Sequence, residues 1–127
     1  MNNRTNIRHW HSAHRDWLRA LKFYNEEMAI LNDRLTEIVG KNSGREVSAQ
    51  VEHYQNSFIL HRNNVEQLER DIHRSLEKIA KELPEQSGFV NTELLVQLEM
   101  ERAAFHEEER EINQLRHAFN LFSAEWM

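Results

Sequence analysis

The chain has no cysteine, and only three glycines and one proline occur among its 127 residues. Without cysteine the protein forms no disulfide, and thiolate zinc sites and cysteine nucleophiles are excluded as well. So little glycine and proline leaves too few turns for β-sandwiches or barrels, and too little glycine for a loop that cradles a phosphate. These shortages exclude most all-β folds and the Gly-rich nucleotide-binding folds.

Long apolar runs are also missing, since no stretch approaches the roughly 18 residues that span a membrane. The first residues are polar and lead into a Trp/His/Arg-rich stretch instead of an apolar signal core. A net charge of −5 argues against binding to a polyanion. With 39% hydrophobic residues, the length suits one domain over residues 1–127. We therefore expect one soluble, cytoplasmic domain that binds neither membrane nor nucleic acid.

Three long segments carry apolar or aromatic residues at steps of three and four, which is the heptad pattern of packed helices. The first seam consists of Trp10, Trp17, Leu21, Tyr24, Met28, Leu31, Leu35 and Ile38. The second consists of Val47, Val51, Tyr54, Phe58, Val65, Leu68, Ile72 and Ile79. The third consists of Leu94, Leu98, Phe105, Ile112, Leu115, Phe119, Phe122 and Trp126. Each seam predicts one long helix.

Two clusters of turn residues, at 40–44 and 84–88, separate the three segments. Short connections make neighbouring helices antiparallel. The predicted fold is all-α: an elongated up-down-up three-helix bundle with the coiled-coil-like packing of spectrin-like bundles. The predicted helices cover about residues 5–39, 44–83 and 92–125.

Local signals support these boundaries. Ser43 and Glu46 have the spacing of a capping box for the second helix. Pro84 is predicted to end that helix, and Asn91 is predicted to cap the third.

Polar residues interrupt the seams at five positions: His14, His61, Ser75, Glu101 and Glu108. Folding the chain at its two loops gives a first estimate of register, which sets Trp17 beside Ile72 and Leu98. The estimate decides which polar residues share a layer.

In this register His61 and Glu108 fall in one layer with Met28. A buried His and a buried Glu are costly apart and much less costly when hydrogen-bonded to each other. We therefore predict that His61 and Glu108 pair. The pair either fixes the register of the bundle or acts as a proton-responsive or ligand-binding site.

The other polar interruptions have no predicted partner of this kind. Glu101 falls in a layer with Leu21 and Leu68, and we expect its side chain to extend to the boundary or to reach an Arg or Lys. His14 lies near an open bundle end, where we expect it to be solvated or bonded to a hydroxyl.

Catalytic and cofactor motifs are absent from the sequence. No Glu-x-x-His pair occurs, which argues against a carboxylate-bridged di-iron site, and no Gly-x-Ser-x-Gly turn occurs. We therefore predict neither an enzyme nor a cofactor. The weak alternative is a zinc site made by the His-x-x-His pair His11 and His14 with His73.

Charge is distributed unevenly along the chain. Residues 1–44 hold seven basic and five acidic side chains, whereas the third predicted helix holds three basic and eight acidic ones. We expect this difference to attract the first and third helices to each other.

Several apolar residues fall outside the seams. Phe23 and Ile30 lie seven apart on one outer stripe of the first helix, and Ile59 and Leu60 lie at a comparable height on the second. A three-helix core cannot easily bury all of them, so they indicate a surface covered by a partner or a second copy. The expected function is a non-enzymatic interaction module, scaffold or assembly subunit. The alternative is a bundle that binds a metal or small ligand through inward His and Glu residues.

Overall fold

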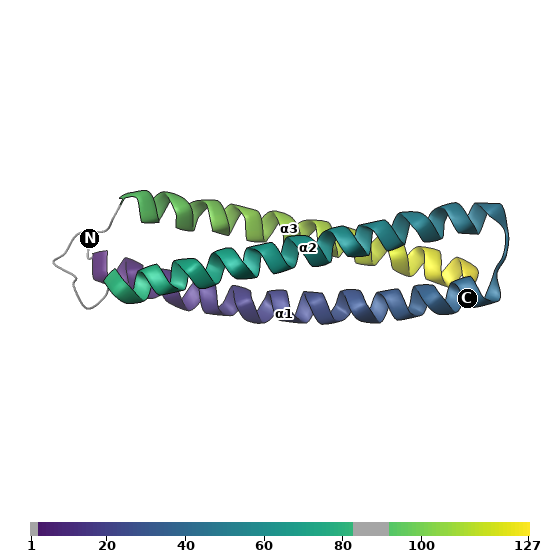
Figure 1. Cartoon of the computed structure of the whole chain (residues 1–127), viewed down its shortest axis with the longest axis horizontal. Coiled ribbons are helices and arrows are strands. Elements are labelled where there is room, and N and C mark those ends of the chain that lie inside the picture. The colour runs from purple at the N-terminus through teal and green to yellow at the C-terminus, as the bar shows by residue number, and fades with distance from the viewer. Residues whose placement is uncertain (1–2, 83–91) are drawn as a thin grey trace.

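The structure, a computed structural model, describes residues 3–82 and 92–127. It contains three helices, α1 (Asn3–Lys41), α2 (Arg45–Glu82) and α3 (Thr92–Trp126). Figure 1 shows α2 running antiparallel to α1 and α3, so the fold is the predicted up-down-up three-helix bundle. Within the described residues, no helix is both long enough and apolar enough to cross a membrane.

The helix ends lie within a few residues of their predicted positions. Gly44 is the N-cap residue of α2, because its carbonyl accepts a 3.1 Å hydrogen bond from the amide of Ser48 in the first turn. The prediction that Ser43 is the N-cap, with Glu46 completing a capping box, is therefore wrong by one residue. The predicted stop at Pro84 and cap at Asn91 lie outside the described residues.

The core contains the predicted seams. Every seam residue is buried except Tyr24 and Trp126, which are half-buried, and the buried apolar side chains of all three helices form one cluster. The polar interruptions are also buried: His14, His61, Ser75, Glu101 and Glu108. Five polar groups inside one apolar core must find partners there, because an unpaired buried polar group destabilises the fold.

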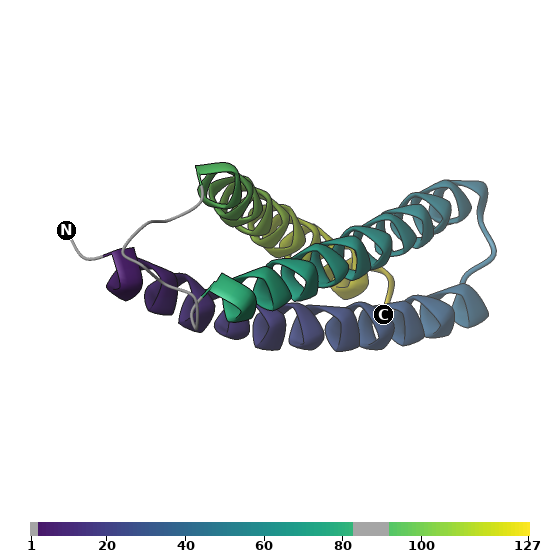
Figure 2. The same ribbon diagram turned by 60° about the vertical axis from the view of Figure 1, so that its left-hand side comes forward.

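The register between α1 and α3 differs from the estimate. The ring of Trp17 stacks on Phe105 with centroids 5.3 Å apart, whereas the estimate placed Trp17 beside Leu98, seven residues earlier. A seam that repeats every seven residues matches itself again after a shift of one heptad, so its pattern alone does not distinguish the two registers. Figure 2 also shows that α3 is inclined to α1. The difference in residue number between facing residues of α1 and α3 is therefore not constant along the bundle.

Candidate functional site

The His14–Glu101 pair joins all three helices. His14 Nε2 lies 2.8 Å from Oε1 of Glu101, and Ser75 Oγ and Gln97 Nε2 each donate to Oε2 of Glu101 over 2.7 Å. The other ring nitrogen, Nδ1, lies 3.0 Å from the backbone carbonyl of Trp10. His14 comes from α1, Ser75 from α2, and Glu101 and Gln97 from α3. One carboxylate therefore collects donors from the whole bundle.

The hydrogen-bond partners of Glu101 determine the direction of its pKa shift. Burial raises the pKa of Glu101, but hydrogen bonds from His14, Gln97 and Ser75 outweigh burial and bring the pKa below its usual value. An ionised carboxylate and the carbonyl of Trp10 can only accept hydrogen bonds. Nδ1 of His14 therefore faces a carbonyl that can only accept, and Nε2 faces the carboxylate of Glu101, so the imidazole bridges two acceptors inside the core.

The expectations for these two residues are wrong. Within the described residues, Glu101 is buried and bonds to His14, Ser75 and Gln97 instead of an Arg or Lys, and His14 is fully enclosed instead of solvated. The cause is the one-heptad difference in register, which moves Glu101 from the level of Leu21 to that of His14. Trp17 also covers the imidazole, with ring centroids 4.5 Å apart.

The predicted contact between His61 and Glu108 is present. His61 Nδ1 lies 2.6 Å from Oε2 of Glu108, and Asn64 Nδ2 donates to Oε1 over 3.0 Å. The hydrogen bond to Glu108 raises the pKa of His61, although burial acts in the opposite direction. This His61–Glu108 pair joins only α2 and α3, and the exposed fractions of its side chains are 10% and 5%.

A second acidic side chain, Glu111, lies beside this pair. In the described part of the chain, His61, Glu108 and Glu111 offer one ligand atom each, and these atoms all lie within 4.8 Å of one another. Imidazole and carboxylate ligands suit a divalent ion such as zinc. The alternative zinc site at His11, His14 and His73 does not form such a group among the described residues.

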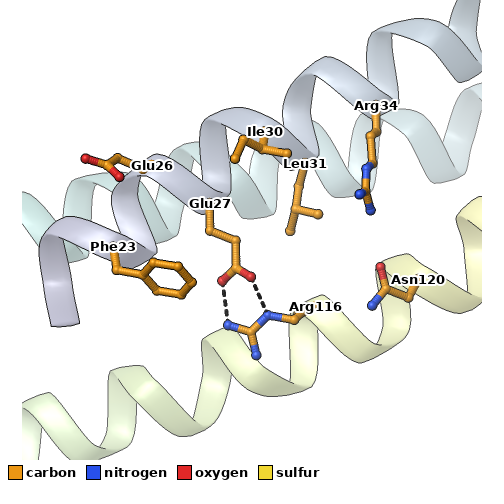
Figure 3. Close-up of a pocket in the computed structure, with 8 residues that line it drawn as sticks. All are labelled: Phe23, Glu26, Glu27, Ile30, Leu31, Arg34, Arg116 and Asn120. Carbon is orange, nitrogen blue, oxygen red and sulfur yellow. Dashed lines mark hydrogen bonds and ion pairs between the residues drawn. The ribbon is translucent and has the colours of Figure 1, made fainter.

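Phe23 and Ile30 are exposed, by 57% and 55%, and both line a groove between α1 and α3. This α1/α3 groove has a volume of about 260 Å³. Figure 3 shows its lining: Phe23, Glu26, Glu27, Ile30, Leu31, Arg34, Arg116 and Asn120. The groove thus combines an apolar edge with charged ends.

Polar contacts between α1 and α3 lie within and beside this groove. Arg116 binds Glu27 through two hydrogen bonds, one of them 2.7 Å long, and this pairing raises the pKa of Arg116. Beside the groove, the Tyr24 hydroxyl donates to Glu109 over 2.6 Å. Burial and that hydrogen bond raise the pKa of Tyr24 to about 12. The uneven charge predicts attraction between basic residues of α1 and acidic residues of α3, whereas this ion pair joins an acid on α1 to a base on α3.

The four off-seam apolar residues do not form one surface. Ile59 is 58% exposed but lines a different groove, between α1 and α2, together with Asn32. Leu60 is exposed and lines neither groove. The continuous part of the predicted surface is therefore the stripe of Phe23 and Ile30.

Comparison of the chain with protein-family models, curated proteins and solved structures finds no match.

Proposed function

We propose that this chain is a non-enzymatic interaction module, a scaffold or assembly subunit that binds a protein through the α1/α3 groove. The observation that carries the proposal is the exposure of Phe23 and Ile30, each more than half accessible at the edge of one groove. Covering this apolar edge with a partner removes it from water and favours association.

The chemistry of the groove supports this proposal. Glu27 and Arg116 already satisfy each other, so a partner does not have to neutralise a buried charge there. Interfaces commonly place an apolar contact at the centre and polar groups at the rim. Phe23 and Ile30 offer such a contact, and Glu26 and Arg34 offer charged groups beside it.

Site-specific photo-crosslinking tests this function. Benzoylphenylalanine in place of Phe23 conserves an aromatic side chain, and the same residue in place of Leu121 is a matched control on α3. Leu121 is 63% exposed and lies at a different groove, between α2 and α3. We expect adducts in cells from position 23 and none from position 121. No adduct at position 23, or the same adducts from both positions, would contradict the proposal.

The His61–Glu108–Glu111 group supports a second candidate function, the binding of one divalent cation. Its ligand atoms lie close enough together to share an ion. Binding would replace the hydrogen bond between His61 and Glu108 and release the proton on Nδ1, so affinity would fall at low pH.

Zinc titration by calorimetry tests the second candidate. We expect one zinc ion per chain, and an affinity at least about tenfold lower in Glu111→Gln. Glu107→Gln on the same helix is the control, because Glu107 is exposed and pairs with Arg110. Heat of binding that is absent in the wild type, or unchanged in Glu111→Gln, would count against a metal site.

A further inference from the structure

Three exposed residues of α1, spaced four apart, carry complementary charges around an apolar centre. Glu26, Ile30 and Arg34 follow one another along α1, and all three are exposed. Residues four apart form one of the ridges on a helix surface. Each charge lies about 6 Å along the helix axis from Ile30, because a helix rises about 1.5 Å per residue. We call these three residues the α1 ridge.

Neither charge of the α1 ridge has a partner within the part of the chain that the structure describes. Glu26 and Arg34 form no hydrogen bond or ion pair with any residue whose side chain the structure describes, which are residues 8–81 and 92–127. Figure 3 shows the contrast with Glu27, which is next in sequence to Glu26 and is paired with Arg116. The ridge therefore presents one free acid, one exposed isoleucine and one free base.

We propose that the partner of the α1/α3 groove is a second copy of this chain, docked antiparallel through the α1 ridge. Ridges of residues four apart from two helices pack side by side in the commonest class of helix crossing. In the antiparallel arrangement, Glu26 of each copy lies beside Arg34 of the other, and the two Ile30 side chains meet at the centre. The inference rests on the proposed function, because it names the partner of the same surface.

The charge order selects this arrangement over a parallel one. Two copies in parallel would place Glu26 against Glu26 and Arg34 against Arg34, whereas a two-fold axis at Ile30 satisfies both charges twice. The ion pairs then fix orientation, since exposed pairs contribute specificity more than affinity. Contact area comes from Ile30 and from Phe23, which lies one heptad before it.

Two charge-reversal variants test the arrangement. Glu26→Arg alone and Arg34→Glu alone each create two like-charge contacts in a homodimer, so each dissociation constant should rise at least about tenfold. A mixture of the two variants should form a heterodimer, because every acid again faces a base. Glu66→Arg is the matched control, since it makes the same change of charge on the exposed face of α2 and should dimerise normally.

Sedimentation velocity and native mass spectrometry measure these outcomes, with circular dichroism to verify that each variant is helical. A wild-type dimer, two weakened variants and a restored mixture support the proposal. If the wild type dimerises and both charge-reversal variants dimerise equally well, the docking arrangement is overturned. A wild type that is monomeric up to about 1 mM overturns self-association. In that case, crosslinking of a different protein at position 23 would leave the proposed function standing, and no crosslink would overturn both.

Discussion

The His14–Glu101 pair and the His61–Glu108 pair differ in how many helices they join and in how much water reaches them. Glu101 accepts hydrogen bonds from all three helices, and the exposed fractions of His14 and Glu101 are 0% and 4%. Among the described residues, Glu108 has hydrogen-bond partners on α2 alone, and the exposed fractions of His61 and Glu108 are 10% and 5%.

This difference indicates separate roles for the same two residue types. The His14–Glu101 pair has no open side, and it connects α1 to α3 at one register only. It is therefore suited to select one register among those that the heptads allow, as buried polar residues do in coiled coils. The His61–Glu108 pair is nearer to solvent and has Glu111 beside it. It is better suited to exchange protons or to hold an ion.

The largest expected effect comes from breaking the more buried pair. His14→Ala leaves the carboxylate of Glu101 buried without its imidazole partner and should lower the free energy of unfolding by about 3–5 kcal/mol. The double variant His14→Leu/Glu101→Leu should lose less, because it replaces both polar side chains by apolar ones and strands no carboxylate in the core. Urea denaturation followed by circular dichroism measures both. A loss in the double variant as large as that of His14→Ala would contradict the expectation that a stranded carboxylate is the main cost of the single change.

A smaller loss is expected at the second pair. His61→Ala should lower the free energy of unfolding by about 2 kcal/mol, because the side chain of His61 is 10% exposed and water can reach the place that it leaves, whereas His14 is fully enclosed. The double variant His61→Leu/Glu108→Leu should again be more stable than the single variant. The same denaturation experiment measures it, and a loss larger than that of His14→Ala would reverse the assignment of roles.

The sequence predicts much of this comparison, but not all of it. Periodicity alone locates the three helices and the buried seams, because an apolar stripe has to face the core wherever the helices pack. It also predicts the contact of His61 with Glu108, since the α2–α3 register estimated from the loop positions is nearly correct at that level.

The His14–Glu101 contact could not be predicted in the same way. It depends on the α1–α3 register, and a shift of one heptad leaves every apolar layer intact while changing the residue that faces His14. The stacking of Trp17 on Phe105 is specific to the observed register. Likewise, the pairing of Glu27 with Arg116 depends on side-chain geometry across two helices, which a one-dimensional pattern does not contain.

The pH dependence of stability should distinguish the pairs by sign. The pKa of His61 is raised in the folded protein, so its contribution is complete below pH 6.5 and is lost as the pH rises through the folded-state pKa. The pKa of Glu101 is lowered, so its contribution is complete above pH 4.5 and is lost as the pH falls through the folded-state pKa.

Denaturation of the wild type and two variants across pH 3 to 9 measures these contributions. His61→Gln should remove part of the loss of stability on the alkaline side, and Glu101→Gln should remove part of the loss on the acid side. The other histidines and acids are common to all three proteins, so differences from the wild type isolate each group. A His61→Gln profile parallel to the wild type above pH 6.5 would contradict the raised pKa.

The smallest expected effects come from removing one neutral donor from each carboxylate. Ser75→Ala and Asn64→Ala both remove a donor that α2 supplies to an acid on α3. Ser75 is buried, so no water replaces its hydroxyl, and the loss should be about 1.5 kcal/mol. Asn64 is only half-buried, so water can replace part of its contact and the loss should be about 0.5 kcal/mol. Urea denaturation measures both losses. If Asn64→Ala proves the more destabilising, Glu108 is shielded from water as completely as Glu101, and the two pairs do not differ in their access to water.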